Sequence, residues 1–331
     1  MGIDFTYMGN HTYLWDQVNH KLSSVAHKMG ITPLIPDRMY KPWDIPGTIS
    51  EEFAAKTGLP KETIVTTGIH DSNSALLPHF AKKGNRKFIL NSTGTWCVIM
   101  NPSEKYGFTP DELGKVVFFN ISAFGEPIKT AIFLGGLEFE TWSRLFLKKH
   151  ETDIMPGWNE ELYHSIFKEK RLFLLPELTP GSGQFPNSRA RIREDGEDYY
   201  FDSLTDNSPP CLIDIEKCFA VLRISLVMQT LTALERAGIR KGFEVYTEGG
   251  FRKDESYNRL LSSALADNKV FLTNISEASA IGAAMTAKMA LGGKSLAELA
   301  DDFDIGYIEQ EKGFFPEMEA YRKAWLELAE K

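Results

Sequence analysis

The amino-acid sequence predicts an α/β fold, because segments with the pattern of β-strands alternate with segments of helical periodicity along most of the chain. Three stretches carry this prediction. Residues 88–100 place two apolar runs around a Ser-Thr-Gly-Thr turn, residues 214–237 hold the longest helical pattern, and residues 243–273 read as strand, helix and strand. With 331 residues, the chain is long enough for one large domain or two ordinary ones.

The first part of the chain has shorter patterns, each marked by a particular residue type. Glycine and serine indicate where helices end and begin, prolines indicate loops, and β-branched residues indicate strands. In chain order we expect a strand over residues 3–8, a helix over 17–30, a proline-rich extended loop over 31–48, a helix over 50–57 capped by Ser50, a strand over 62–67, and a helical turn over 72–80 interrupted by Pro78. The charged turn at 82–87 follows and is the best internal boundary.

The second part has longer and more regular patterns. In chain order we expect a hairpin over 88–100, a helix within 130–147 that follows Gly135-Gly136, a loop rich in Pro, Gly and Ser with a hairpin over 176–210, a helix over 214–237, a strand over 243–247, a helix over 254–266, a strand over 269–273, a helix of small residues over 277–291, and an amphipathic helix over 317–330.

Composition restricts the class of protein. The chain is 43% hydrophobic and 25% charged with a net charge of −8, which is typical of a globular protein and disfavours nucleic-acid binding. It has no run of about 18 apolar residues, so no membrane span is expected. The cysteines Cys97, Cys211 and Cys218 lack metal-ligand spacing, and no signal peptide is evident, so reduced thiols in a cytoplasmic protein are expected.

Asp71 follows a predicted strand directly and precedes a predicted helical turn. An aspartate there can be a helix cap. It can also be a general base, because the carboxyl ends of strands in α/β sheets form the ligand-binding crevice. The neighbouring His70 reads, from its type alone, as a packed or hydrogen-bonded ring.

Two turns could approach a phosphate. The Ser92-Thr93-Gly94-Thr95 turn combines small hydroxyls with a glycine, and the Glu248-Gly249-Gly250 segment joins a strand to a helix. Taken alone, each favours a purely structural interpretation. The Gly-Gly-Lys-Ser run at 292–295 is not a P-loop, since Lys288 stands where that motif needs glycine, and no Gly-x-Gly-x-x-Gly or zinc pattern occurs.

Taken in order, these motifs resemble the FGGY family of carbohydrate kinases. The series consists of Asn10-His11-Thr12-x-Leu14-Trp15-Asp16, Gly-x-His-Asp ending at Asp71, Ser-Thr-Gly-Thr-Trp, Glu-Gly-Gly, and the small-residue helix from Glu277. The His-Asp pair looks most like the rhamnulokinase and fuculokinase branch. The resemblance implies the actin-like, ribonuclease-H-like ATPase fold, with residues 1–82 forming the latter part of the sugar-binding domain and 83–331 the nucleotide-binding domain. It also implies that the front of the first domain, with its phosphate hairpin, is missing.

The resemblance also implies roles for individual residues. Asp71 would be the general base, with His70, Ser72 and Asn73 at the sugar. The ATP-binding residues would be Thr93, Gly94, Thr95, Gly135, Gly136, Gly249, Gly250 and Asp254. Two positions depart from the family pattern, because Asp254 stands where Asn is common and Trp96 is bulky.

The expected activity is transfer of the γ-phosphate of ATP to a hydroxyl of a small ketose or polyol, with Mg²⁺ as cofactor. The resemblance also implies a homodimer, and it leaves the identity of the sugar open. Two alternatives stay open, a truncated remnant that binds nucleotide without catalysis, and an actin-like ATPase that does not act on sugars. Closure of the two domains about the turn at 82–87 is a further hypothesis.

Overall fold

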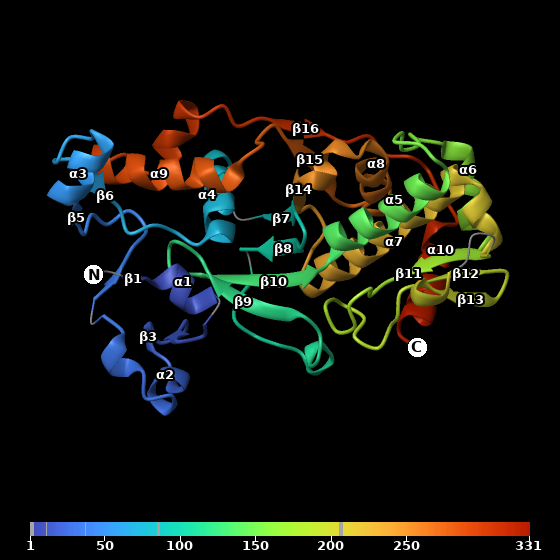
Figure 1. Ribbon diagram of the computed structural model, residues 1–331, viewed down its shortest axis with the longest axis horizontal. Coiled ribbons are helices and arrows are strands. Elements are labelled where there is room, and N and C mark those ends of the chain that lie inside the picture. Colours follow the sequence, from blue (N-terminus) through green and yellow to red (C-terminus); the bar gives the residue numbers. More distant parts are fainter. Residues whose placement is uncertain (1–2, 11, 37, 85–86, 103, 205–207) are drawn as a thin grey trace.

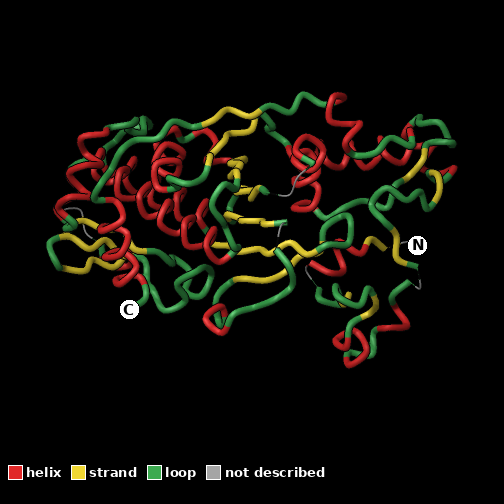
Figure 2. Tube along the Cα trace, turned by 180° about the vertical axis from the view of Figure 1, so that it is seen from behind, coloured by secondary structure: helices red, strands yellow, loops and turns green. Residues whose placement is uncertain are grey.

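A central sheet with helices on both of its faces organises the structure, a computed structural model that describes residues 3–10, 12–36, 38–84, 87–102, 104–204 and 208–331 (Figure 1). His11 of the Asn-His-Thr segment and Asn85 and Arg86 of the charged turn lie outside the described residues. The view from behind shows the central strands between two groups of helices (Figure 2). The predicted α/β class is therefore confirmed.

The strands fall into one large sheet and several small ones. They are β1 (Ile3–Asp4), β2 (Trp15–Asp16), β3 (Lys21–Leu22), β4 (Met39–Tyr40), β5 (Gly47–Thr48), β6 (Ile64–Val65), β7 (Phe88–Thr93), β8 (Cys97–Asn101), β9 (Val117–Ile121), β10 (Pro127–Phe133), β11 (Leu172–Leu175), β12 (Arg191–Glu194), β13 (Glu197–Tyr200), β14 (Glu244–Gly249), β15 (Lys269–Thr273) and β16 (Tyr307–Glu309). The seven-stranded sheet has the order β16-β15-β14-β7-β8-β10-β9. Within it, β14 runs parallel to both β7 and β15, and the other pairs are antiparallel.

The helices lie mainly on the two faces of this sheet. They are α1 (Phe5–Asn10), α2 (Ser24–Lys28), α3 (Glu51–Thr57), α4 (Asp71–Lys83), α5 (Gly135–Lys149), α6 (Glu160–Glu169), α7 (Ile215–Arg236), α8 (Glu255–Ala264), α9 (Ala278–Gly292) and α10 (Met318–Ala329). In Figure 1, α4 and α9 lie on one side of the central strands, and α5, α7 and α8 lie on the other.

Alternating side chains of β7 build the core on both faces of the sheet. Phe88 and Leu90 pack in one cluster with Ala75 and Leu76 of α4, whereas Ile89 belongs to the larger cluster that contains α7. This is the two-residue period of a strand that is buried on both faces. Among the described residues, α7 alone has the length and apolar composition of a membrane span, and 94% of that segment is buried inside the protein, as in a core helix.

Helix α4 carries Asp71 at its first position and packs closely on α9. A Cβ atom on Gly282 of α9 would lie 1.9 Å from the carbonyl oxygen of Ser74, and the Ser74 hydroxyl donates to the Ser279 carbonyl at 2.6 Å. Pro78 was predicted to interrupt this helix, but α4 continues through it to Lys83. The small residues of α9 thus allow two backbones to lie in contact beside the sheet.

The long helix predicted over 17–30 is wrong. The Asp16 carboxylate accepts hydrogen bonds from the amides of Val18 and Asn19, which forms a turn, and Ser23 then caps a helix that begins only at Ser24. The strand predicted over 62–67 shrinks to β6, because its partner β5 offers two residues for pairing. Of the strand predicted over 3–8, only β1 forms, and α1 begins directly after it. The extended loop predicted over 31–48 contains β4, which pairs in parallel with β1.

Candidate active site

The parallel strands β7 and β14 end side by side, with Thr93 opposite Gly249. Gly249 has φ +78°, and a Cβ atom there would lie 2.1 Å from the Thr93 carbonyl oxygen. The Thr93 hydroxyl donates to the Glu248 carbonyl and accepts from the Phe251 amide at 2.9 Å. These contacts fix the Glu-Gly-Gly segment against the end of β7.

The turn between β7 and β8 is also fixed against the start of α5. The Gly94 amide donates to the Trp96 carbonyl at 3.0 Å, and the Leu137 amide donates to the Thr95 carbonyl at 3.2 Å. A Cβ atom on Gly136 would lie 1.9 Å from the Gly94 carbonyl oxygen. The turn of residues 93–95, the first turn of α5 and the Gly249-Gly250 segment, which are far apart in sequence, are therefore neighbours in space.

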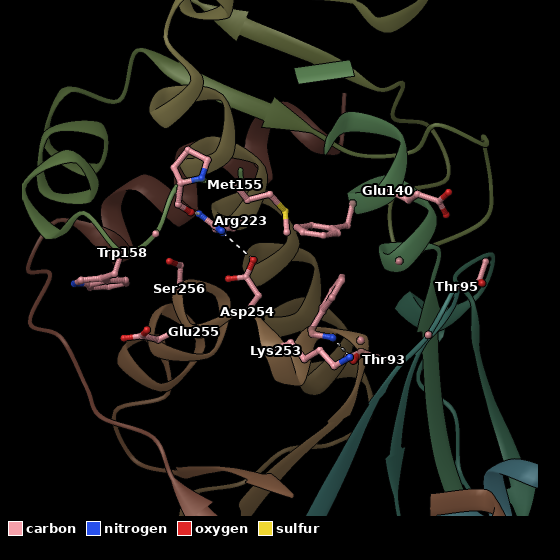
Figure 3. A pocket seen from close by; sticks show the side chains of 17 residues that line it. Thr93, Thr95, Glu140, Met155, Trp158, Arg223, Lys253, Asp254, Glu255 and Ser256 are labelled. Atoms are coloured by element: carbon pink, nitrogen blue, oxygen red, sulfur yellow. Dashed lines mark hydrogen bonds and ion pairs between the residues drawn. The ribbon is translucent and has the colours of Figure 1, made fainter. Parts of the chain in front are cut away.

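These three segments form one wall of a cavity of about 590 Å³, hereafter the glycine cavity (Figure 3). Its lining comprises Thr93, Gly94, Thr95, Gly136, Phe139, Glu140, Met155, Pro156, Gly157, Trp158, Arg223, Gly250, Phe251, Lys253, Asp254, Glu255 and Ser256. Two of the predicted ATP-binding residues are not in this lining. Gly249 is exposed and lies against Thr93, whereas Gly135 is buried against Cys97 and Phe133.

Asp254 closes the far side of the glycine cavity. It caps α8, since one carboxylate oxygen accepts from the Tyr257 amide at 2.9 Å, and the other oxygen accepts from Arg223 Nε at 2.9 Å. The exposed fractions of the Arg223 and Asp254 side chains are 6% and 11%, and Figure 3 shows them pointing toward one another. Arg223 also donates to the Pro156 carbonyl at 2.8 Å, which holds the 155–158 segment over the cavity.

Two buried titratable groups, Glu138 and Cys97, lie close to the glycine cavity in the chain without lining it. Burial raises the pKa of Glu138 in α5 to about 7, and its carboxylate accepts from the Glu177 amide and from Gln229 Nε2, each at 2.8 Å. Burial also raises the pKa of the Cys97 thiol well above its usual range. Cys97, Cys211 and Cys218 are all buried and unbridged.

Asp71 lines a second cavity, of about 550 Å³, hereafter the Asp71 cavity. Its lining comprises Asn10, Tyr13, His70, Asp71, Ser72, Trp96, Val98, Phe118, Asn120 and Ile132. The cap residue of α4 is His70, and Asp71 is the first helical residue, so the capping interpretation of Asp71 does not apply. The Asp71 side chain is 78% exposed and lies 3.2 Å from His70 Nε2.

The predicted sugar-binding residues occupy different positions around Asp71. His70 and Ser72 line the Asp71 cavity, and the Ser72 amide donates to Asp71 Oδ1 at 2.6 Å. Asn73 is buried and lies outside the lining of this cavity, and neither of its amide atoms is hydrogen-bonded to the part of the chain that the structure describes.

One turn separates the two cavities. Thr95 lines the glycine cavity, and the next residue, Trp96, lines the Asp71 cavity. The exposed carboxylate of Asp71 and the glycine turns therefore lie on either side of the same short segment. Such an arrangement can bind two substrates across a single backbone turn.

Sequence reasoning missed several lining residues. Phe139, Met155, Trp158 and Arg223 line the glycine cavity, and Asn120 lines the Asp71 cavity. The Met-Pro-Gly-Trp run at 155–158 combines turn residues with an aromatic ring and was the one available signal. Asn10 belongs to the family-like segment at 10–16, which by itself predicts no role for its side chain.

The described residues contain no group of three or more His, Cys, Asp or Glu side chains suited to a metal ion. Magnesium in phosphoryl-transfer sites is held by one or two carboxylates together with substrate phosphates and water. The side chains present are therefore compatible with a Mg²⁺ ion that arrives with a nucleotide.

Comparisons with known proteins bear on the family and the fold of the chain. The family model described as carbohydrate kinase FGGY, C-terminal domain, matches residues 85–295. Among solved structures, the chain is similar to a carbohydrate kinase from Novosphingobium aromaticivorans (23% identity, TM-score 0.74, 98% of this chain and 64% of that one). It is also similar to a ligand-bound xylulose kinase from Lactobacillus acidophilus (15% identity, TM-score 0.68, 99% and 63%) and to a glycerol kinase from Plasmodium falciparum with ADP (15% identity, TM-score 0.70, 99% and 63%).

The chain thus spans slightly less than two thirds of the length of these relatives. Comparison with curated protein sequences gives no match. At these identities the similarity to solved structures shows a shared fold.

Proposed function

The chain belongs to the FGGY family of carbohydrate kinases, and from this premise we propose that the protein transfers the γ-phosphate of ATP to a hydroxyl of a small ketose or polyol. The predicted actin-like ATPase fold is confirmed by its similarity to the solved carbohydrate kinases. The observation that carries the activity is the position of the turn after β7, which has the glycine cavity on one side and the Asp71 cavity on the other.

In this proposal the glycine cavity binds ATP. Thr93, Gly94 and Thr95 hold the β- and γ-phosphates, because a glycine turn lets backbone and hydroxyl groups approach a phosphate closely. Gly136 borders the phosphates in the first turn of the 15-residue helix α5, with Gly135 packed behind it.

The rest of the nucleotide extends toward α8. Gly250 and the adjacent Gly249 lie under the α-phosphate and ribose, and Asp254 lies near the adenine. The apolar side chains of Phe139, Met155 and Trp158 provide surface for a base. Mg²⁺ would arrive with the nucleotide, held by its phosphates and by water, and would neutralise phosphate charge when bound.

Asp71 acts as the general base. Its exposed carboxylate accepts the proton of the attacking sugar hydroxyl while the oxygen forms a bond to the γ-phosphorus and ADP departs. His70 lies beside the carboxylate, and the Ser72 amide bonds one of its oxygens, so both help to orient it. Ser72 faces the sugar within the Asp71 cavity, and Asn73 supports this helical turn from its buried position.

The division at residues 82–83 remains part of the proposal. Helix α4 ends at Lys83, whose ammonium group lies 3.0 Å from the Glu244 carboxylate of β14. Helix α9 returns from the second predicted domain to pack on α4, so α4 and α9 together connect the two. Closure about this connection would exclude water from the transferring phosphoryl group.

The experiment is Asp71→Asn, with Asp301→Asn as a matched control at an exposed position. We expect wild type and the control to form ADP in the presence of a ketose or polyol, and Asp71→Asn to lose at least about a hundredfold in rate. Mg-ATP affinity, measured by calorimetry, should stay unchanged in both variants. If wild type binds Mg-ATP but forms no sugar-dependent ADP, the nucleotide-binding or ATPase alternative replaces the kinase.

A further inference from the structure

Two buried asparagines line the Asp71 cavity at some distance in sequence from the base. Asn10 is the last residue of α1 and Asn120 lies in β9, and their exposed fractions are 5% and 4%. Each has one polar atom for which the described residues provide no hydrogen-bond partner, Nδ2 in Asn10 and Oδ1 in Asn120. Leaving such an atom buried and unpaired is unfavourable, so these two atoms require an explanation.

The orientation of the Asn10 amide is determined by its neighbour. Asn10 Oδ1 accepts a hydrogen bond from the Ile121 amide at 2.8 Å, so the oxygen must face β9. The Asn10 NH₂ group is therefore the end of the amide that lacks a partner, and it is a hydrogen-bond donor.

The orientation of the Asn120 amide is determined in the same way. The Thr130 hydroxyl donates to the Ile128 carbonyl at 3.2 Å, so it accepts from Asn120 Nδ2 at 3.3 Å. The Asn120 Oδ1 atom is then an acceptor without a partner. Since Asn10 is bonded to the residue that follows Asn120, the two amides belong to one small region of the cavity wall.

One donor and one acceptor together match an alcohol, which can accept one hydrogen bond and donate another. We propose that Asn10 and Asn120 jointly bind a single hydroxyl group of the sugar, other than the one that is phosphorylated, and thereby act as specificity-determining residues. The inference rests on the proposed kinase function, because it needs a polyhydroxy substrate in the Asp71 cavity.

The rest of the cavity wall suits the remaining surface of such a molecule. Trp96 is 40% exposed, and Val98 and Ile132 line the cavity with it. Sugars present C–H groups between their hydroxyls, and these can pack on an indole and aliphatic side chains. A sugar could therefore place one hydroxyl at the two amides and pack its C–H groups against Trp96, so that it contacts both the polar and the apolar parts of the cavity lining.

The test uses steady-state kinetics of ADP formation with D-xylulose, L-xylulose, D-ribulose, L-ribulose and glycerol. These ketopentoses differ in hydroxyl configuration, and glycerol lacks the distal hydroxyls altogether. In Asn10→Ala and in Asn120→Ala, we expect KM for the preferred ketopentose to rise about tenfold and the preference among the ketopentoses to shrink. KM for ATP and for glycerol should stay unchanged, as should every parameter of the exposed control Asn187→Ala.

A double variant sharpens the test. If both amides bind the same hydroxyl, Asn10→Ala with Asn120→Ala should raise KM about as much as either change alone, whereas independent packing roles would multiply the two effects. Asn10→Asp preserves the Ile121 hydrogen bond but replaces the free donor by an acceptor, so it should reproduce the KM rise even if Asn10→Ala folds poorly.

The inference is overturned if KM changes equally for all five substrates, or if the two single effects multiply. A wild-type protein that forms no ADP with any of these substrates refutes the kinase proposal itself, and the hydroxyl subsite with it. The two failures are therefore distinguishable by the wild-type rate alone.

Discussion

The carbonyl oxygen of Thr93 lies 2.1 Å from the position that a Cβ atom on Gly249 would occupy. Gly249 also has φ +78°, so Gly249→Ala introduces both an unfavourable backbone conformation and a steric clash. We expect the free energy of unfolding to fall by about 2–5 kcal/mol. Mg-ATP affinity, measured by calorimetry, should fall at least tenfold, because the ends of β7 and β14 are forced apart.

Gly242→Ala is the matched control for this change. Gly242 has φ +81°, but beyond the residues adjacent in the chain, no described residue would lie within 4 Å of a Cβ atom there. In this variant the free energy of unfolding should fall by only about 1–2 kcal/mol, the contribution of the backbone conformation, and Mg-ATP should bind as in wild type. Equal losses in the two variants would show that the contact with Thr93 has no importance beyond the backbone angle.

Gly282→Ala should separate α9 from α4. The new methyl group would lie 1.9 Å from the Ser74 carbonyl oxygen, so the helices must move apart, at a cost of about 1–3 kcal/mol in unfolding free energy. Because α4 carries Asp71, the rate of sugar-dependent ADP formation should fall as well. Gly292→Ala, in the last turn of the same helix with no close neighbour, should leave activity intact and be neutral or stabilising by up to about 1 kcal/mol. A Gly282→Ala variant as stable and active as wild type would contradict this account.

Asp254→Ala should destabilise the protein and weaken nucleotide binding together. It removes the cap of α8 and leaves the buried Arg223 guanidinium without its carboxylate, which costs about 3–5 kcal/mol for a buried pair. Urea unfolding and Mg-ATP titration measure the two effects. Glu255→Ala, an exposed neighbour in the same cavity, should change stability by no more than about 0.5 kcal/mol. The prediction fails if the two variants behave alike.

Stability should fall as the pH rises through neutrality, because of Glu138. Burial raises its pKa from 4.5 to about 7, so the folded protein prefers the protonated carboxyl. That contribution is fully present below about pH 4.5 and is lost as the pH rises through about 7. Glu138→Gln should therefore reduce the difference in unfolding free energy between pH 5 and pH 8, by up to about 3 kcal/mol.

The exposed Glu140→Gln variant, on the same helix, is the control for this pH dependence and should match wild type. Some pH dependence will persist in Glu138→Gln, since burial also raises the pKa of Glu177. Identical profiles for wild type and Glu138→Gln would mean that Glu138 stays ionised in the folded protein.

The sequence was most informative where local and tertiary preferences agree. The hairpin of β7 and β8, helices α7 and α8, strand β15 and helices α9 and α10 follow their predicted ranges closely. The capping residues Asp214 and Asp254 stand directly before α7 and α8, whose apolar residues are buried in the core. The helix over 17–30 failed because Asp16 and Ser23 form local hydrogen bonds that compete with helix formation, a preference that hydrophobic spacing does not reveal.

The site was predictable only in part. The rule that ligands bind at the carboxyl ends of strands directed attention to Asp71, and the glycines and hydroxyls of two turns directed attention to Thr93 and Gly249. The family resemblance supplied the roles of all three residues, and the structure places Thr93 opposite Gly249. Arg223 could not be recognised, because it lies among apolar residues in the middle of α7 and its partner Asp254 is 31 residues away. The role proposed for Asn120 could not be predicted from sequence, because it depends on the pairing of β9 with β10. There Asn120 Nδ2 bonds to Thr130, while Asn120 Oδ1 has no partner among the described residues.

Thr95 and Trp96 are consecutive residues that face different cavities. Any shift of that peptide caused by an occupant of one cavity alters the wall presented to an occupant of the other. By thermodynamic linkage, the factor by which nucleotide changes sugar affinity must equal the factor by which sugar changes nucleotide affinity. A single peptide bond therefore joins the walls of the two cavities, and any coupling that passes through it acts with equal strength in both directions.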